Sequence, residues 1–534
     1  MRFVFFKLLV IAVLLFSFGG CASKNLPTPV DTKVSHKHLK ASDSLYYLAK
    51  DDLKGHGNKS GFYPLQNNLD AFMARVYLIE NAKKSLDLQY FIFAEDEISY
   101  AITKLLLDAA DRGVHVRVLI DDLLEKDKDV EIATISQHPN IEVKLFNPTS
   151  FRKTAGWIQM AFSLNTLGRR MHNKLLVADN SAFVVGGRNI ENVYYAADKD
   201  NIFIDNDVLC IGPLAAEASN EFETYWNYPL SKNIQEISPQ TRTPKEYKNL
   251  KKKLDETVNS ISYGSYIKEA KSRKFAQAAL KNEIPLVYGD AKIYFDIPTK
   301  IISSEEDTSS HLSERISPYI LNAKKSIRII NPYFMPNEHI MKNLKMLRKK
   351  GVEIYILTNS LATNDGIPVY SAYSRYHKDL LDIGVHLYEL NPNSFQYIYK
   401  KQKYRKGSIP RSALHAKSMV IDDNIFIIGS ANLDPRSIKL NTEVVAVIKS
   451  KDLALIEKRV FDNAIKPQNV FTLSLEKAPK KPCIATCVPQ EERRVVWTTQ
   501  ENGKTVRYYD DGNAGFWRRL GSNLYMYIPL DKYL

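Results

Sequence analysis

Two copies of one side-chain pattern carry the chemistry that this sequence suggests. Each copy has a histidine, a lysine two residues later and an aspartate five residues after the lysine: His172, Lys174 and Asp179, then His415, Lys417 and Asp422. Six residues separate each aspartate from a similar tail, Gly186-Gly187-Arg188-Asn189 and Gly429-Ser430-Ala431-Asn432. One copy would be weak evidence, but two copies at identical spacing predict that both serve one function.

The apolar residues between each lysine and aspartate predict that both copies are buried β-strands. Residues two apart on a strand point to the same face, so the histidine and the lysine of each copy share a face. The aspartate falls on the opposite face. It is therefore expected to support the site without touching substrate, although it belongs to the catalytic motif.

Two imidazoles, two ammonium groups and two amides suit one ligand, a tetrahedral anionic phosphoryl group. We expect the tails to bind its oxygens beside the lysines, through Asn189, Asn432, Gly187 and Ser430. One histidine can attack phosphorus while the other, protonated, gives its proton to the departing alcohol.

Two further carboxylates follow the two copies in similar contexts, Asp207 in Asn206-Asp207-Val208 and Glu443 in Thr442-Glu443-Val444. A carboxylate that accepts a hydrogen bond from an imidazole fixes its tautomer and stabilises the imidazolium. We therefore expect Asp207 and Glu443 to orient the two imidazoles. The alternative is that both are ordinary acids at strand ends.

The rest of the chain is also duplicated. The sequence of residues 81–85 is repeated unchanged at 322–326, an offset of 241 residues, and the two motif histidines are 243 residues apart. In the first half, alternating periodicity predicts helices over 71–84 and 98–112 and strands over 85–93, 114–121 and 141–146. The duplication predicts an α/β protein of two homologous halves, related by a pseudo-twofold axis that brings the two motifs into one shared active site.

The paired motifs resemble the HKD signature of the phospholipase D superfamily, and the surrounding sequence is similar to its bacterial cardiolipin synthase branch, particularly the C-type enzymes. The stretches that carry this resemblance are 88–92, 112–122, 145–148, 169–174, 357–361, 434–437 and 441–443. The likeness covers about residues 60 to 460.

This resemblance implies two phospholipase D-like α/β/α halves, phospholipid substrates at a membrane surface, and neither metal nor cofactor. It implies phosphatidyl transfer through a phosphohistidine, with His172 as the nucleophile and His415 as the general acid and base; the two roles could be exchanged. Three alternatives stay open: a hydrolytic phospholipase D, a nuclease, and a lipoprotein scaffold without catalysis. Two intact motifs argue against the scaffold.

Composition and the N-terminus place this chemistry at a membrane. The net charge of +14 favours anionic partners, either nucleic acid or acidic lipid head groups. Residues 1–20 have the basic start and short apolar run of a signal peptide, and Cys21 after two glycines resembles a bacterial lipidation site. We expect a lipoprotein anchored on the periplasmic side, at the outer membrane by analogy, for which nucleic acid is an unlikely partner.

The predicted domain organisation is a signal peptide (1–20), a lipid-anchored tether (21–60), the first half (61–230), a helical linker (231–285), the second half (286–470) and a C-terminal extension (471–534). Four cysteines are too few for a disulfide framework. Cys483 and Cys487 are close enough in sequence to pair, which is left open, and Cys210 is expected to be a buried thiol. The sequence predicts no oligomeric state.

Overall fold

The computed structural model describes residues 55–122, 133–148, 168–198, 200–237, 243–394, 411–478, 493–512 and 514–525. All of these residues belong to one compact unit, Val34–Leu534. The signal peptide, the lipidation site Cys21, most of the tether, Cys483 and Cys487 lie outside the described residues. The predictions for them stay predictions.

The first half is built on a mixed sheet. Its strands lie in the order β1 (Ser60–Leu65), β8 (Asp207–Ile211), β6 (Ala182–Gly186), β5 (Leu175–Ala178), β2 (Ser85–Tyr90), β3 (His115–Asp121), β4 (Ile141–Phe146) and β9 (Ser231–Asn233). Strands β2, β3 and β4 are parallel and the other pairs are antiparallel. The central strands form because runs of apolar, often β-branched residues are buried on both faces.

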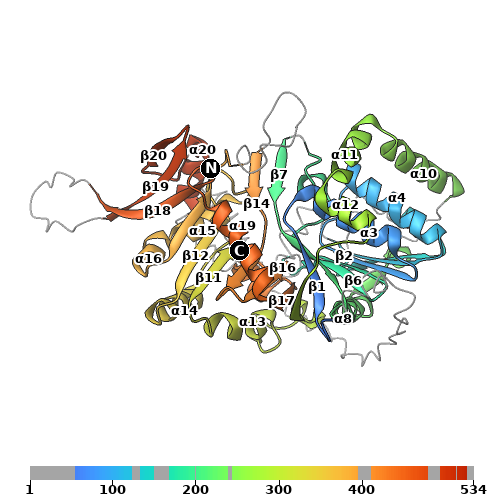
Figure 1. Ribbon diagram of the computed structural model, residues 1–534, viewed down its shortest axis with the longest axis horizontal. Coiled ribbons are helices and arrows are strands. Elements are labelled where there is room, and N and C mark those ends of the chain that lie inside the picture. The colour runs from blue at the N-terminus through green and yellow to red at the C-terminus, as the bar shows by residue number, and fades with distance from the viewer. Residues whose placement is uncertain are drawn as a thin grey trace, which may run out of the picture. The chain divides into compact units, whose positions relative to one another are not determined.

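The second half repeats this order. Its strands are β10 (Val287–Phe295), β17 (Val444–Lys449), β16 (Ile425–Gly429), β15 (Ser418–Ile421), β11 (Ser326–Ile330), β12 (Glu353–Asn359), β13 (His386–Leu390) and β18 (Val470–Lys477), extended by β19 (Arg493–Glu501) and β20 (Lys504–Tyr508). Strand β1 pairs with β10, which joins the halves into one sheet of 18 strands among the described residues. The predicted α/β fold of two homologous halves is confirmed (Figure 1).

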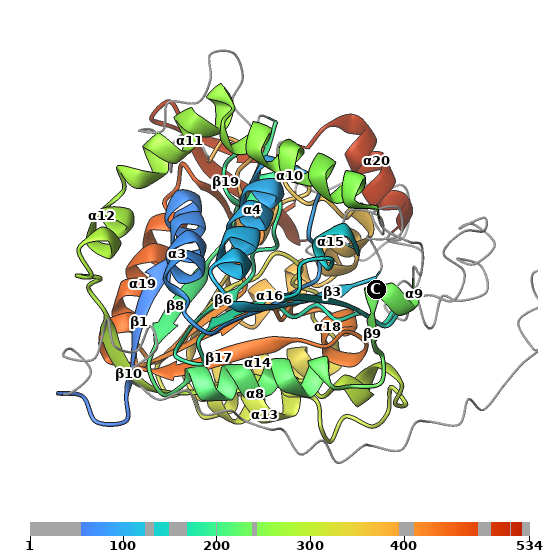
Figure 2. The ribbon, with the colours of Figure 1, turned by 90° about the vertical axis from the view of Figure 1, so that its right-hand side faces the viewer.

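Helices cover both faces of each half. In the first, α3 (Asn68–Asn81) and α4 (Glu97–Asp111) lie on one side of the sheet and α8 (Ala215–Trp226) on the other (Figure 2). The equivalents in the second half are α13 (Leu312–Leu321), α14 (Glu338–Lys349) and α19 (Lys451–Ala464). The faces that carry α8 and α19 share a single hydrophobic core, which includes Phe222 and Phe426. Burial of this shared core stabilises the contact between the halves.

The predicted linker packs on the first half. Its helices α10 (Pro244–Val258), α11 (Ile261–Lys271) and α12 (Lys274–Leu280) lie against α4 and α3. The part of the large sheet that belongs to the second half continues past residue 470, because β18 pairs with β13. The remaining elements are η4 (Asn192–Tyr194), α9 (Ile234–Ile237), η5 (Pro298–Ile301), α15 (Ile367–Ser374), α16 (His377–Asp382), α18 (Pro435–Lys439) and α20 (Phe516–Tyr525).

A small second sheet crosses from one half to the other. Strand β7 (Asn201–Ile204) of the first half pairs in parallel with β14 (Arg411–Leu414) of the second, and Figure 1 shows them side by side between the two halves. On the first motif's side, Met171 makes an isolated parallel bridge with Thr442. Each motif histidine therefore follows directly after a segment that is bonded to the opposite half.

Candidate active site

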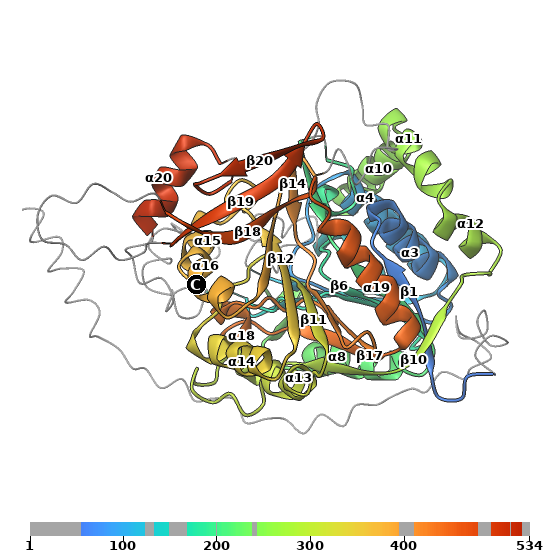
Figure 3. The same cartoon turned by 60° about the vertical axis from the view of Figure 1, so that its left-hand side comes forward.

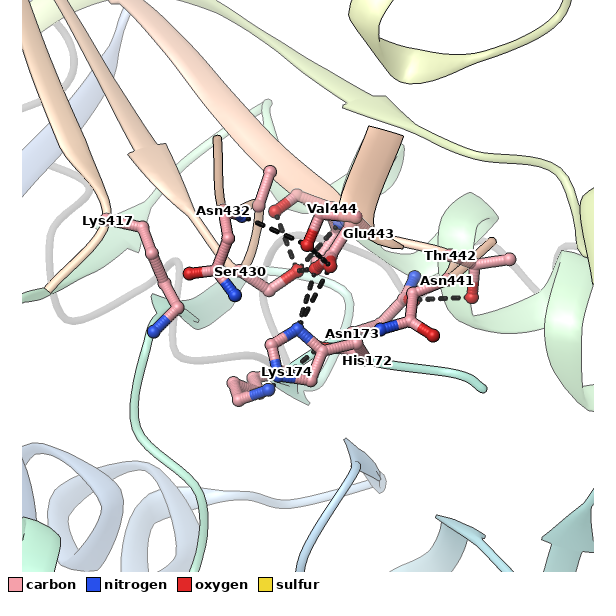
Figure 4. A network of polar contacts seen from close by, with 12 residues as sticks. His172, Asn173, Lys174, Lys417, Ser430, Asn432, Asn441, Thr442, Glu443 and Val444 are labelled. Carbon is pink, nitrogen blue, oxygen red and sulfur yellow. Dashed lines mark hydrogen bonds and ion pairs between the residues drawn. The ribbon is translucent and has the colours of Figure 1, made fainter. Parts of the chain in front are cut away.

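The crossing at Met171 places His172 against a carboxylate of the second half. His172 N donates to the carbonyl of Thr442 at 2.9 Å, so Glu443, the next residue, faces the imidazole. His172 Nδ1 lies 3.0 Å from both Glu443 oxygens, the contact at the centre of Figure 4. A carboxylate only accepts, so Nδ1 carries the hydrogen and Nε2 keeps its lone pair.

The second motif histidine makes the equivalent contacts with the first half. His415 N donates to the carbonyl of Ile204 at 2.8 Å, and His415 Nδ1 lies 2.7 Å from Asp205 Oδ2. Each motif histidine is thus held by a buried carboxylate from the opposite half. The two motifs form one site, and neither half contains a complete set of these contacts by itself.

The prediction for Asp207 is wrong, because its carboxylate lies 3.0 Å from Arg75 and 3.2 Å from Arg188. Strand register explains the error. Gly186 pairs with Asp207, whereas Gly429 pairs with Val445, two residues after Glu443. The equivalent of Glu443 is therefore Asp205, two residues before Asp207.

Sequence reasoning missed Asp205 because the connection after the first tail is longer. Asn189 and Asp205 are 16 residues apart, whereas Asn432 and Glu443 are 11 apart, so spacing alone does not align the two carboxylates. The local likeness of Asn206-Asp207-Val208 to Thr442-Glu443-Val444 then favoured the wrong residue. The signal that identifies Asp205 is the strand register, because the first glycine of each tail pairs with the residue two positions after the carboxylate.

Two tail residues that were predicted to bind substrate contact these carboxylates. Ser430 Oγ donates to Glu443 at 2.5 Å (Figure 4). Ser437 Oγ donates to the same side chain at 2.7 Å. A Cβ atom on Gly187 would lie 2.2 Å from Asp205 Oδ1, so only glycine lets that carboxylate approach. Ser430 and Gly187 position the carboxylates, which corrects the predicted role.

The motif aspartates lie at the far end of their strands from the histidines. Asp179 accepts backbone hydrogen bonds from Lys83, Lys84 and Ser85 at 2.8–3.0 Å. Asp422 accepts the equivalent bonds at 324–326, at 2.7–3.0 Å. They fix the turns that lead into β2 and β11, so the structure gives Asp179 and Asp422 a supporting place and no catalytic contact.

The motif lysines lie beside their histidines. Lys174 Nζ donates to the His172 carbonyl at 2.8 Å, and Lys417 Nζ lies 3.0 and 3.2 Å from the ring nitrogens of His415. The two tail asparagines differ. Asn189 already donates to the Tyr194 hydroxyl at 2.9 Å and accepts from the backbone of Ile92. Asn432 Oδ1 is buried and accepts no hydrogen bond from the described residues.

Burial sets the protonation of the site's basic groups. It lowers the pKa of His172 to about 4, against the opposing effect of Glu443, and it lowers the pKa of His415 to about 4, with the charge of Lys417 adding to the shift. Burial also lowers the pKa of Lys174 to about 7 and that of Lys417 to about 8. Near neutral pH both imidazoles are neutral.

The two carboxylates remain ionised in spite of their burial. Burial opposes the charge of Asp205, but His415 and Lys417 hold its pKa below the usual range. Burial likewise opposes the charge of Glu443, and His172 and Lys174 overcome it. Charged carboxylates beside neutral imidazoles keep the hydrogen on Nδ1 and leave Nε2 for a substrate.

Aromatic rings enclose the two histidines unequally. The ring centroids of Tyr194 and Phe203 lie 5.1 Å from that of His415, and Tyr333 lies 6.4 Å away. His172 has Phe91 at 5.1 Å. These rings exclude water from the second imidazole more completely, and sequence reasoning did not predict them.

Among the described residues, no group of three or more histidine, cysteine or acidic side chains could hold a metal ion. Within the same residues, none of the helices has the length and apolar character needed to span a bilayer. Cys210 is a buried free thiol, as predicted.

Comparison with known proteins agrees with this geometry. A family model described as "Cardiolipin synthase, PLD-like domain" matches residues 76–226 and again 316–465. Cardiolipin synthase C of Escherichia coli (strain K12) is 33% identical over 89% of this chain and 96% of its own length, and an uncharacterized protein of Helicobacter pylori (strain ATCC 700392 / 26695) is 33% identical over 96% and 97%. The crystal structure of phosphatidylserine synthase from Haemophilus influenzae Rd KW20 shares the fold, with a TM-score of 0.53 at 16% identity over 79% of this chain and 91% of that chain.

Proposed function

The chain belongs to the cardiolipin synthase, PLD-like domain family, and we propose that it forms cardiolipin from phosphatidylglycerol and a second phospholipid, by transferring a phosphatidyl group to the glycerol head group of phosphatidylglycerol. One observation carries the proposed mechanism. Each motif imidazole is held through Nδ1 by a carboxylate of the opposite half, so both can act through Nε2 on one phosphorus.

In the first step, the lone pair of His172 Nε2 attacks phosphorus. The bond between phosphorus and the glycerol head group breaks, its electron pair goes to the glycerol oxygen, and His415 Nε2 gives that oxygen a proton. The products are phosphatidyl-His172 and glycerol. His415 acquires its proton when the anionic phosphodiester enters, because a negative charge nearby raises the pKa of an imidazole.

In the second step, His415 is neutral and acts as a base. It takes the proton of an incoming head-group hydroxyl, whose oxygen attacks phosphorus while the bond to His172 Nε2 breaks. His172 regains its lone pair, and His415 releases the proton to solvent when the product leaves, so it again takes up a proton with the next phosphodiester. Glu443 and Asp205 stabilise each imidazole when it carries positive charge.

The phosphoryl oxygens bind to Lys174, Lys417 and the amides of the tails. Asn189 already donates through Nδ2 to the Tyr194 hydroxyl, so Asn432 is the amide better placed to donate an N–H to a phosphoryl oxygen. Buried ammonium groups stabilise the added negative charge of the transition state more than exposed ones would.

Water could replace the alcohol in the second step, which would make the protein a hydrolytic phospholipase D. A nucleic acid phosphodiester could replace the lipid, which would make it a nuclease, and a scaffold would use neither motif. The two preserved relays from carboxylate to imidazole support catalysis over the scaffold. The similarity to cardiolipin synthase C over most of both chains supports the lipid acceptor.

A lipid assay tests the proposal. Purified full-length protein is incubated with phosphatidylglycerol vesicles, with and without phosphatidylethanolamine, and the products are identified by mass spectrometry. We expect cardiolipin, which is absent with His172→Ala and His415→Ala. Phosphatidic acid alone would establish hydrolysis, and activity on single-stranded DNA without any lipid product would establish a nuclease. If no substrate gave a product, a scaffold without catalysis would be the remaining alternative.

We further propose that the N-terminus anchors the protein in the cell envelope through acylation of Cys21, on the periplasmic side of the outer membrane. The short apolar run before two glycines and Cys21 supports this placement. Metabolic labelling with a palmitate analogue should mark the wild type, and Cys21→Ser should lose the label and leave the membrane fraction. Equal labelling of both would contradict the proposal.

A further inference from the structure

The space behind the first motif is filled by a buried polar cluster. Arg75 donates to Asp207 at 3.0 Å and to the Tyr90 hydroxyl at 3.2 Å, and its guanidinium stacks over Tyr195. Arg188 lies 3.2 Å from the same Asp207. Arg75 and Arg188 are among the largest fully buried side chains of the described residues.

The internal duplication identifies the same four positions in the second half. The repeated segment at 81–85 and 322–326 aligns Arg75 with Ile316 and Tyr90 with Asn331. The two glycine tails align Arg188 with Ala431. Strand register aligns Asp207 with Val445. Three of the four polar side chains are thus replaced by apolar ones, and the fourth by the smaller asparagine.

All four of these replacement residues, Ile316, Asn331, Ala431 and Val445, line a cavity of about 330 Å³. It lies between α13 and α14 on one side and strands β11, β15, β16 and β17 on the other, the region at the lower left of Figure 3. Most of the surface that lines the cavity is apolar, with contributions from Leu344, Leu347, Met419 and Ile427. The polar cluster of the first half has therefore been exchanged for an apolar space.

This cavity begins at the active site and ends at the surface. Lys417, Asn432 and Glu443 belong to its lining, and Figure 4 shows these three residues beside His172 and Lys174. Glu314 and Lys439, which are both exposed, also belong to its lining. A ligand with a phosphoryl group among the motif residues can therefore extend an apolar portion between the helices and the sheet.

The helix over this cavity is less buried than its counterpart, which α11 and α12 also cover. Helix α3 buries eleven of its residues, including Phe72 and Leu78, whereas α13 buries only Leu312. A proline, Pro318, lies inside α13, where it removes a backbone hydrogen bond. An amphiphile can be admitted beneath α13 at less cost than beneath α3, where it would have to displace a close-packed layer.

We propose that this cavity binds one acyl chain of the phospholipid whose phosphoryl group occupies the active site. The inference rests on the proposed function and adds where the lipid tail lies. Its volume is about twice the 150 Å³ of an engineered apolar cavity that excludes water and binds benzene, and it falls in the usual range for ligand pockets. In the described part of the first half, the Arg75–Asp207 cluster fills the equivalent position, so a second lipid finds no matching space there.

Filling the cavity tests this proposal. Ile316→Trp and Ile320→Trp, combined, place two indoles against its lining, and Arg315→Trp puts the same side chain outside the lining of the same helix. The measured quantity is the ratio of kcat/KM for dipalmitoyl phosphatidylglycerol to kcat/KM for bis(4-nitrophenyl) phosphate, a soluble diester without acyl chains. We expect the double variant to lower this ratio at least tenfold and Arg315→Trp to leave it within twofold of the wild type. An unchanged ratio in the double variant would overturn the proposal.

A second measurement uses the wild type and so does not depend on the variants folding. Phosphatidylglycerol with a diazirine near the end of one acyl chain is photolysed with the full-length protein in vesicles, and the adducts are mapped by mass spectrometry. We expect adducts on 312–347 and 419–438, reduced by excess unlabelled dipalmitoyl lipid but not by bis(4-nitrophenyl) phosphate. Adducts confined to other segments would contradict the proposal. If the wild type converts neither substrate, the proposed function fails, whereas conversion of both without these adducts overturns only the acyl-chain site.

Discussion

The two halves of the molecule share a strand order and a motif but differ in what surrounds the motif. Behind His172 and Lys174 lies the Arg75–Asp207–Arg188 cluster, and behind His415 and Lys417 lies an apolar cavity. The second imidazole is enclosed by three aromatic rings and the first contacts one. A duplicated fold has thus kept its strands and reacting groups while the space beside them has changed.

The exchange of carboxylates explains why both halves persist in one chain. His172 depends on Glu443 and His415 on Asp205, so the segments that cross between the halves are required for each relay. Symmetry brings the two histidines to one site, whereas the differences around them can assign nucleophile and acid.

The largest effect is expected from the histidines themselves. His172→Ala and His415→Ala should each lower cardiolipin formation by about 10⁴-fold or more, since both are needed in every turnover. They should differ with bis(4-nitrophenyl) phosphate, whose leaving group needs no proton. His415→Ala should still form an adduct on His172 and then stop, whereas His172→Ala should form none. Mass spectrometry of the intact protein and its peptides measures both.

Two outcomes would change this assignment. An adduct on His415 in the His172→Ala protein would exchange the two roles. No adduct in either variant, or in the wild type quenched during turnover, would argue against a covalent intermediate. Circular dichroism of both variants serves as the control that each substitution has left the fold intact.

The carboxylates should give the next largest effect, about 10²–10³-fold in kcat. In Glu443→Gln, an amide N–H₂ facing the imidazole favours the tautomer with hydrogen on Nε2, which removes the lone pair of the nucleophile. Asp205→Asn does the same to His415. We expect Glu443→Gln to slow formation of the histidine adduct and Asp205→Asn to slow its breakdown. Pre-steady-state release of 4-nitrophenol separates the two steps, and equal slowing of both steps in both variants would contradict the asymmetry.

The sequence predicted the fold because repeated residues, such as those at 81–85 and 322–326, reveal the duplication. The regular alternation of helix and strand periodicity indicates the α/β class. The sequence also located the histidines, the lysines and Glu443. It misplaced Asp207 because the connection before Asp205 is five residues longer than its counterpart, and only strand pairing reveals the correct register. The cavity could not be predicted, since Ile316 and Val445 are ordinary core residues until the residues opposite them are known.

The polar cluster and the cavity should respond differently to substitution. Asp207→Leu leaves Arg75 and Arg188 buried without their carboxylate, and is expected to lower the free energy of unfolding by about 3–5 kcal/mol. Val445→Ala, at the equivalent position, removes two methyl groups from a cavity wall and should cost about 1.6 kcal/mol, the transfer free energy of two buried methylene equivalents. Urea denaturation followed by circular dichroism compares them. Equal costs would mean that the two positions are packed alike.

The smallest effect is expected from the difference between the two lysines. Burial lowers both pKa values, but Lys417 faces the carboxylates of Asp205, Glu443, Asp365 and Asp434, which keep its pKa at about 8. Burial lowers the pKa of Lys174 to about 7, because the nearby charge of Lys417 also opposes its protonated form and Glu443, which favours that form, offsets the two effects only in part. As pH rises, Lys174 should lose its proton first.

The pH profile of kcat/KM for bis(4-nitrophenyl) phosphate reports this difference, because this substrate needs no general acid. Activity should fall below pH about 4, where His172 becomes protonated, and above pH about 7, where Lys174 becomes neutral and binds the anion less well. Arginine stays charged throughout, so Lys174→Arg should move the alkaline limb to about 8, set by Lys417, while Lys417→Arg should leave it near 7. Both substitutions will lower the rate, since a guanidinium does not replace an ammonium in shape, but the position of the limb is independent of that loss. If the two variants gave the same limb, the lysines would titrate as one group and the halves would be electrostatically equivalent at the phosphoryl group.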